Sequence, residues 1–179
     1  KGHHCKMHLV RNRNLLYLVE GDDEKKLVNT LKNSMGLIHP GKVQKLNVIE
    51  CNITDLHLRT LAKGTIVVLI FDTDTDNVAR LDKNIEKLKS CSAISAVVTI
   101  PQVPNLEGEL VRSCNIKVIA ELLNSKSTKE YKSDLIRVSN LDQKLKEHQF
   151  DINIFWSKNP KPPYHLIENQ AAVIKQPKK

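Results

Sequence analysis

The sequence has few cysteines and no long apolar run. Its only cysteines are Cys5, Cys51, Cys91 and Cys114, and no two of them form a Cys-x-x-Cys pair. This wide spacing matches neither a zinc ribbon nor the framework of a disulfide-rich domain. No apolar run approaches the roughly 18 residues of a membrane span, and we expect no signal peptide before the first predicted strand. The expectation is a cytoplasmic protein with reduced thiols and no membrane partner.

Acidic residues are outnumbered by basic ones. The 179 residues include 28 Lys plus Arg and 20 Asp plus Glu, so the formal net charge is +8. A basic body favours a polyanionic partner such as nucleic acid. Charge alone does not decide the matter, since many small proteins are basic without binding nucleic acid. The length suits one ordinary domain with a real core and a small appendage.

Carboxylates directly follow two apolar runs. Residues 15–19 are apolar and precede Glu20, whereas residues 66–71 are apolar and precede Asp72 and Asp74. Runs of this kind are typical of fully buried parallel strands, and open α/β sheets bind ligands at the carboxyl ends of such strands. If the two strands are neighbours, the three carboxylates converge and need a cation between them. Oxygen ligands of this type suit Mg²⁺ or Mn²⁺.

The same residues carry a family resemblance. Glu20-Gly21 after the first strand and Asp72-Thr73-Asp74 after a later one resemble the two hallmark motifs of the Toprim domain. The resemblance spans about the first hundred residues, and the chain is most similar to small Toprim proteins related to overcoming-lysogenization-defect and phage-defence nucleases. It implies that Glu20 is the general acid or base, that Asp72 and Asp74 hold the metal, and that Gly21 lies in the substrate-binding turn.

The order of apolar and polar segments predicts an α/β fold. A second strand is predicted over residues 43–51, a short helix over 52–62 and a fourth strand over 94–100. Alternating strands and helices imply right-handed crossovers and a parallel sheet. We therefore predict a Toprim-like, Rossmann-like fold in which helices flank a mostly parallel four-stranded sheet.

Three regions follow from this prediction. Residues 1–14 form a flexible basic N-terminus, and residues 15–112 form the Toprim-like α/β core. Residues 113–179 form a helical, basic C-terminal extension, in which residues 150–156 alternate in character and can add an edge strand. A Ser127-Thr128-Lys129-Glu130 capping box opens one of the helices of this extension.

Helix starts account for several acidic residues. After Glu20, Asp22 is predicted to cap a helix that Gly21 allows to begin with a tight turn. Asp23 and Glu24 are interpreted as favourable charges of the first helical turn rather than as ligands. Asp76 is likewise assigned to an N-cap before it is considered as a metal ligand.

Glu107 has two interpretations. It follows the fourth strand in a loop with two prolines, at the same predicted edge of the sheet. Since defence-type Toprim nucleases use extra acidic residues for a second metal, the resemblance makes Glu107 a further metal ligand. Alternatively, Glu107 and Glu109 are first-turn carboxylates of the next helix. The sequence leaves both open.

A basic loop near the C-terminus offers phosphate contacts. Lys158 and Lys161 lie close in sequence to Trp156 and Tyr164. We predict that the two lysines bind substrate phosphate and that the rings stack on an unpaired base. The alternative is that Trp156 is a core anchor whose lysine neighbours reach out to solvent.

These features favour a metal-dependent nuclease that hydrolyses DNA or RNA, with a role in phage defence. The chain has room for neither the strand-passing region of a topoisomerase nor the polymerising domain of a primase. A second hypothesis is a non-catalytic, nucleic-acid-binding module that acts with a larger defence partner. A third is a receiver-like phospho-switch, because Asp22, Asp23 and Asp72 also form an acidic pocket.

Overall fold

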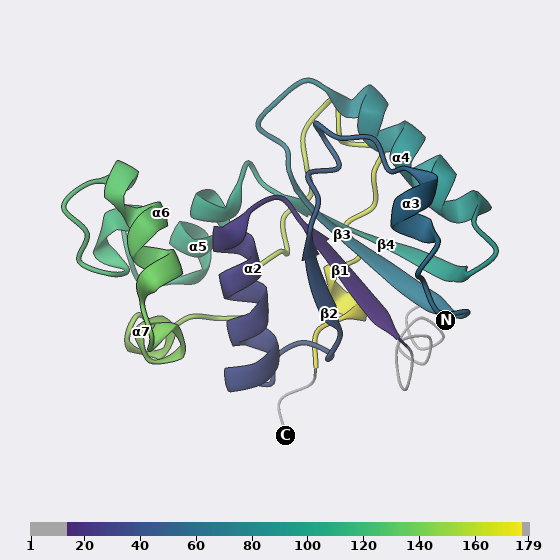
Figure 1. Ribbon diagram of the computed structural model, residues 1–179. Helices are drawn as coiled ribbons and strands as arrows, with labels where there is room; N and C mark the ends of the chain where they lie inside the picture. Colours follow the sequence, from purple (N-terminus) through teal and green to yellow (C-terminus); the bar gives the residue numbers. More distant parts are fainter. Residues whose placement is uncertain (1–13, 177–179) are drawn as a thin grey trace.

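A four-stranded parallel sheet forms the centre of the computed structural model, which describes residues 14–176 (Figure 1). The predicted α/β class, with a parallel sheet flanked by helices, is confirmed. The predicted flexible N-terminus lies outside the described residues except for Asn14. In the spatial order β2-β1-β3-β4, the strands are β2 (Lys42–Lys45), β1 (Leu15–Val19), β3 (Thr65–Asp72) and β4 (Ile94–Gln102).

Helices cover both faces of the sheet (Figure 1). α2 and α5 lie on one face, with α6 and α7 packed beyond them against α2 and its continuation, and α3 and α4 lie on the other face (Figure 1). The helices are α2 (Asp22–Asn29), α3 (Asp55–Leu58), α4 (Val78–Ser90), α5 (Leu106–Ser113), α6 (Thr128–Arg137) and α7 (Leu141–Glu147). Shorter turns are the π-helical continuation of α2, Thr30–Ser34, and the 3-10 turns Ile119–Glu121 and Ala171–Val173.

Burial on both faces explains the continuous apolar runs. Tyr17 and Val68 belong to the cluster under α2 and α5, whereas Leu18 and Leu69 belong to the cluster under α4. Because successive side chains of a strand point to opposite faces, a strand covered on both sides has no solvent-facing row. The two central strands, β1 and β3, therefore read as unbroken hydrophobic segments.

Strand order creates a switch point between β1 and β3. From β1 the chain crosses to β2 on one side, and it then returns past β1 to β3 on the other side. Side chains at the carboxyl ends of the two strands consequently border a crevice, which is the usual ligand site of open α/β sheets. The pairing of Leu18 with Leu69 brings Glu20 and Asp72, which follow shortly after, to neighbouring strand ends.

Two predicted strands differ from the structure. Residues 150–156 form turns, not an edge strand, because Ile152, Phe155 and Trp156 are all buried instead of alternating with solvent. β2 ends at Lys45, well before residue 51, because Asn47 Oδ1 accepts hydrogen bonds from following backbone N–H groups and bends the chain. The predicted helix over 52–62 shrinks to the single turn α3.

The C-terminal segment, described here over residues 114–176, shares the core of the sheet. Tyr131, Leu135, Phe155 and Trp156 pack in the same hydrophobic cluster as alternate residues of β1 and β3. The predicted cap of α6 is confirmed, since the Ser127 hydroxyl accepts a hydrogen bond from the Glu130 N–H. The C-terminal segment thus packs directly against the sheet that carries the acidic residues.

Gly41, just before β2, has no room for a side chain. A Cβ atom there would lie 2.7 Å from Leu15 Cβ and from the Leu15 carbonyl oxygen, and 3.0 Å from Tyr17 Cε2. We expect Gly41→Ala to lower the free energy of unfolding by about 1–3 kcal/mol, because backbone and buried side chains must shift. Urea unfolding measures this. Gly36→Asn is the control, since Gly36 has open space around it and asparagine tolerates its positive φ of 60°. Equal stability of Gly41→Ala and the unsubstituted protein would contradict the prediction.

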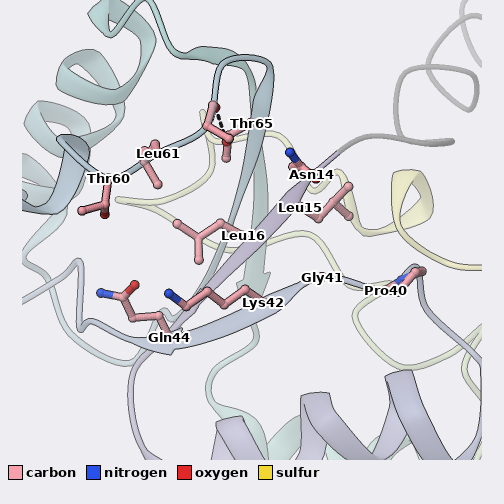
Figure 2. A pocket seen from close by; sticks show the side chains of 11 residues that line it. Asn14, Leu15, Leu16, Pro40, Gly41, Lys42, Gln44, Thr60, Leu61 and Thr65 are labelled. Carbon is pink, nitrogen blue, oxygen red and sulfur yellow. Dashed lines mark hydrogen bonds between the residues drawn. The ribbon is translucent and has the colours of Figure 1, made fainter.

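A pocket opens at the amino-terminal edge of the sheet (Figure 2). It has a volume of about 420 Å³, and Leu16, Leu61 and Thr65 are among its lining residues. Among the described residues, Lys42 is the one charged side chain that lines it, and they place no group of catalytic side chains there. The pocket lies at the edge opposite to the carboxyl ends of the strands. In the described residues, no helix has both the length and the apolar character needed to cross a membrane.

Candidate metal centre

Three carboxylates meet at the switch point. Glu20, Glu24 and Asp72 each contribute one oxygen to a group in which all the oxygens lie within 4.8 Å of one another. Glu24 is buried, and the other two residues are half-buried. Two oxygen ligands of one Mg²⁺ ion lie at most about 4.2 Å apart, so only a small approach would bring all three into one coordination sphere.

Backbone geometry positions Glu20 and Asp72 against each other. Glu20 follows the last residue of β1, and Asp72 is the last residue of β3. The Asp72 N–H donates a 3.1 Å hydrogen bond to Glu20 Oε1. This bond ties one carboxylate of the site to the main chain of the neighbouring strand end, which limits the directions in which Glu20 can point.

Glu24 reaches the site from the first turn of α2. The helix begins directly after Gly21, whose φ of −146° and ψ of −174° are extended and open to any residue. The chain bends at Gly21, but this bend does not depend on the conformational freedom of glycine. Its lack of a side chain matters instead, because a Cβ atom would lie 3.0 Å from Asp23 Oδ1 and 3.2 Å from Glu24 Oε2. Glycine leaves the space that these carboxylates occupy.

Asp22 does not cap α2. The N-cap is Gly21, and no side chain closes the helix N-terminus there. Asp22 is exposed, and its Oδ1 lies 2.9 Å from Lys45 Nζ. Asp76 also does not cap the next helix, since the N-cap of α4 is Asn77. Both sequence-based assignments were wrong because each helix begins one residue away from the expected position.

Burial raises the pKa of all three clustered carboxyl groups. For Asp72 the negative charge of Glu20 adds to the effect, and for Glu24 a hydrogen bond with Asp23 and the charge of Asp23 do the same. For Glu20, hydrogen bonds with the backbone and side chain of Asp72 lower the pKa, but burial raises it by more. Crowded, desolvated carboxylates favour either a bound proton or a bound cation.

One oxygen of Glu24 has no hydrogen-bond partner. Glu24 is 5 % exposed, and within residues 14–176 no donor reaches its buried Oε2. A buried carboxylate oxygen without a partner costs free energy, so such groups are rare in native proteins. This oxygen lies on a residue of the carboxylate cluster, where a cation would satisfy it. The donor set, all carboxylate oxygens, fits Mg²⁺ or Mn²⁺.

Asp74 and Glu107 lie outside the three-carboxylate group. Asp74 is exposed on the loop after β3, where its Oδ2 accepts a long, 3.4 Å hydrogen bond from Asn105. Its charge nevertheless raises the pKa of Glu20 and Asp72, so it is close to the group. Glu107 stands in the first turn of α5, and its Oε1 lies 3.5 Å from Lys132 Nζ.

Two residues of this region were not predicted from the sequence. Glu24 was interpreted as a first-turn helix charge, and Gln102 was not considered. Gln102 is fully buried at the end of β4, and its Nε2 donates a 2.7 Å hydrogen bond to Asp72 Oδ1. A signal for Glu24 was available, since it lies one helical turn after the strand-end Glu20. Gln102 reaches Asp72 because β4 lies beside β3, and no sequence motif predicts that these two strands are neighbours.

The predicted base-stacking rings are not available. Trp156 is 1 % exposed and Tyr164 is fully buried, so the interpretation of Trp156 as a core anchor is confirmed. Tyr164 packs against Phe71 with 6.2 Å between ring centroids. Lys158 and Lys161 are exposed on the same loop, which leaves their side chains accessible to a phosphate backbone.

Comparison with protein-family models, with curated proteins and with solved structures found no match to this chain.

Proposed function

We propose that this protein is a metal-dependent nuclease that hydrolyses phosphodiester bonds of DNA or RNA. The observation that carries the proposal is the meeting of Glu20, Glu24 and Asp72 at the switch point of a parallel sheet, with a buried Glu24 oxygen that lacks a partner. The resemblance of Glu20-Gly21 and Asp72-Thr73-Asp74 to the Toprim motifs supports the same activity.

Glu24 and Asp72 would hold a Mg²⁺ or Mn²⁺ ion, with Asp74 near enough to contribute from the exposed side. When bound, the ion would polarise the phosphodiester, lower the pKa of a water and neutralise charge in the transition state. Glu107 faces Lys132, so its part in a second metal site remains a prediction that this conformation does not support.

Glu20 is the residue that would transfer the proton. Its carboxyl pKa is raised by burial, which moves it closer to neutral pH, where a general acid or base is most effective. The Asp72 N–H holds Glu20 Oε1 in place. Its position beside Glu24 and Asp72 would put the proton-transferring group next to the scissile phosphate.

The substrate would be attracted by the basic body of the protein. The net charge of +8 favours a polyanion through counterion release, with little dependence on base sequence. Lys158 and Lys161, exposed on the C-terminal loop, would contact the phosphate backbone. A role in phage defence, with a larger partner protein, is the biological setting that the resemblance suggests.

Cleavage of labelled DNA and RNA tests the proposal. With Mg²⁺ or Mn²⁺ we expect cleavage by the unsubstituted protein and a loss of at least about a hundredfold in Glu20→Gln and in Asp72→Asn, because each variant removes a group needed for proton transfer or ion binding. Asp82→Asn, on the exposed surface of α4, is the control and should cut normally. Normal cleavage by Glu20→Gln and Asp72→Asn would refute the assignment of the site.

A non-catalytic, nucleic-acid-binding module is the second candidate, and one observation favours it. Lys45 and Lys132, which lie at the rim of the site, are already engaged by Asp22, Asp23 and Glu107. Neither is free to stabilise transition-state charge in this conformation. Tight, salt-sensitive binding that is equal with and without metal, together with no cleavage, would favour this candidate. The receiver-like alternative loses support because Asp22 pairs with Lys45 away from Asp72.

A further inference from the structure

A buried glutamine connects the acidic site to the only tryptophan of the chain. Gln102 Nε2 donates to Asp72 Oδ1 at 2.7 Å, and Gln102 Oε1 accepts from Trp156 Nε1 at 3.1 Å. Gln102 is fully buried, and Trp156 is 1 % exposed. The two residues are 54 positions apart in sequence. No water can compete easily for these groups, so the hydrogen bonds set the orientation of the amide.

The indole sets the direction of this chain of hydrogen bonds. Indole N–H is a donor only, so it can pair only with the oxygen of the Gln102 amide. That pairing turns the amide NH₂ group toward Asp72. A donor next to Asp72 favours its ionised form, whereas the flipped amide would place two oxygens against each other. Asp72 can keep this bond through Oδ1 and still offer its other oxygen to a cation.

Trp156 is itself held on several sides. Its backbone N–H donates to Glu109 Oε2 at 3.2 Å, and its carbonyl accepts from Asn169 Nδ2 at 3.0 Å. Its φ of 55° lies in the left-handed region, which is unusual for a bulky residue and persists only where surrounding contacts hold it. The backbone of Trp156 is thus held by Glu109 of α5 and by Asn169.

We propose that Gln102 is a positioning residue for the metal centre, and that Trp156 fixes the Gln102 amide in the orientation that makes Asp72 a cation ligand. The inference rests on the proposed function, because it assumes that Asp72 binds a metal ion. It assigns the C-terminal segment a role in the site, although the segment contributes no ligand of its own. Groups that orient a metal ligand typically affect metal affinity by about 10–100-fold.

Calorimetric titration with Mn²⁺ alone tests the proposal in the full chain. We expect Gln102→Met, which keeps the length of the side chain but has no amide, to bind Mn²⁺ about tenfold more weakly than the unsubstituted protein. Trp156→Phe, which keeps an aromatic ring but lacks the N–H, should weaken binding severalfold. Gln170→Leu is the matched control, because Gln170 Oε1 accepts from the Thr99 N–H of the same strand, β4, and does not touch the site.

A second readout uses Trp156 directly. Since it is the sole tryptophan, its fluorescence reports on this position alone. Mn²⁺ should change the emission of the unsubstituted protein with the same midpoint as the calorimetric titration, and this change should shrink in Gln102→Met. If Gln102 only filled space, Gln102→Met would leave the Mn²⁺-dependent change in Trp156 emission as it is in the unsubstituted protein. Trp156→Phe also keeps the test decisive if Gln102→Met fails to fold.

The outcomes separate the two proposals. Unchanged Mn²⁺ affinity in folded Gln102→Met and Trp156→Phe would overturn the positioning role while leaving the metal centre in place. If the unsubstituted protein binds no Mn²⁺, both ideas are wrong. If it binds Mn²⁺, shows the expected losses in the variants and cuts neither DNA nor RNA, the positioning role stands and the nuclease function is refuted.

Discussion

Replacement of Glu24 by glutamine is expected to abolish metal-dependent cleavage and to weaken Mn²⁺ binding by about a hundredfold or more. The variant removes the proposed ligand whose buried oxygen has no hydrogen-bond partner within residues 14–176. At about pH 5 it should change the stability of the metal-free protein by less than about 1 kcal/mol, because burial raises the Glu24 pKa and the side chain is then a neutral group of the same shape as glutamine. Calorimetry, cleavage assays and urea unfolding measure the three quantities.

Asp22→Asn is the matched control for this experiment. Asp22 and Glu24 both stand in the first turn of α2, so the two variants make the same carboxyl-to-amide change beside the same helix N-terminus. Asp22 faces Lys45 rather than the cluster, and its variant should bind Mn²⁺ normally. Equal losses in Asp22→Asn and Glu24→Gln would mean that general electrostatics, and not ligation, explains the effect. Normal metal binding in Glu24→Gln would exclude Glu24 from the site.

The metal-free protein is expected to lose stability as the pH rises, and a metal ion should reverse this loss. Glu20, Glu24 and Asp72 have pKa values in the folded state above the ordinary carboxyl range near 4. The folded protein therefore holds protons that the unfolded chain has released. The stability linked to these protons is fully present below the ordinary pKa and falls as the pH rises through neutrality, by up to about 1.4 kcal/mol per pH unit for each such proton.

Urea unfolding from about pH 5 to about pH 8, with chelator or with saturating Mg²⁺, measures this linkage. Because the ion must displace the protons, the stabilisation by Mg²⁺ should increase with pH. In Glu24→Gln, both the decline without metal and the gain with metal should be smaller. A gain from Mg²⁺ that does not depend on pH would contradict the view that these carboxylates share one cation.

The central strands were readable from sequence because they are buried on both faces. Residues 15–19 and 66–71 are apolar at every position, a pattern that few surface segments show, and the polar residues that end them mark the edge of the sheet. The alternation of strands and helices then determined parallel order. Glu20 and Asp72 could be predicted for this reason alone.

The other members of the site could not be predicted with the same certainty. Whether Glu24 faces the sheet depends on the residue at which α2 begins, and the sequence placed that start one residue too late. Asp74 seemed equivalent to Asp72, but the strand ends at Asp72 and the next residues turn outward into an exposed loop. A shift of one residue at the end of an element changes which side chains enter a site.

Long-range packing misled the interpretation of the C-terminal region. Alternation in residues 150–156 suggested an edge strand, and Trp156 suggested a stacking platform beside Lys158. In the structure the segment coils into turns because three of its apolar side chains reach the core together, and Trp156 becomes the partner of Gln102. The local sequence pattern of a segment does not show whether its apolar side chains will fill a hydrophobic core against strands that are distant in sequence.

By itself, the sequence determined the α/β class, the parallel sheet and the pair Glu20 and Asp72, because these depend on burial pattern and on strand order along the chain. Only the tertiary structure decided that Glu24 joins Glu20 and Asp72 in one carboxylate group and that Trp156, Gln102 and Asp72 are hydrogen-bonded in series. These contacts join α2, β4 and the C-terminal segment to the end of β3. Their side chains meet through helix start, strand adjacency and core packing, which are properties of the folded chain and not of any local stretch of residues.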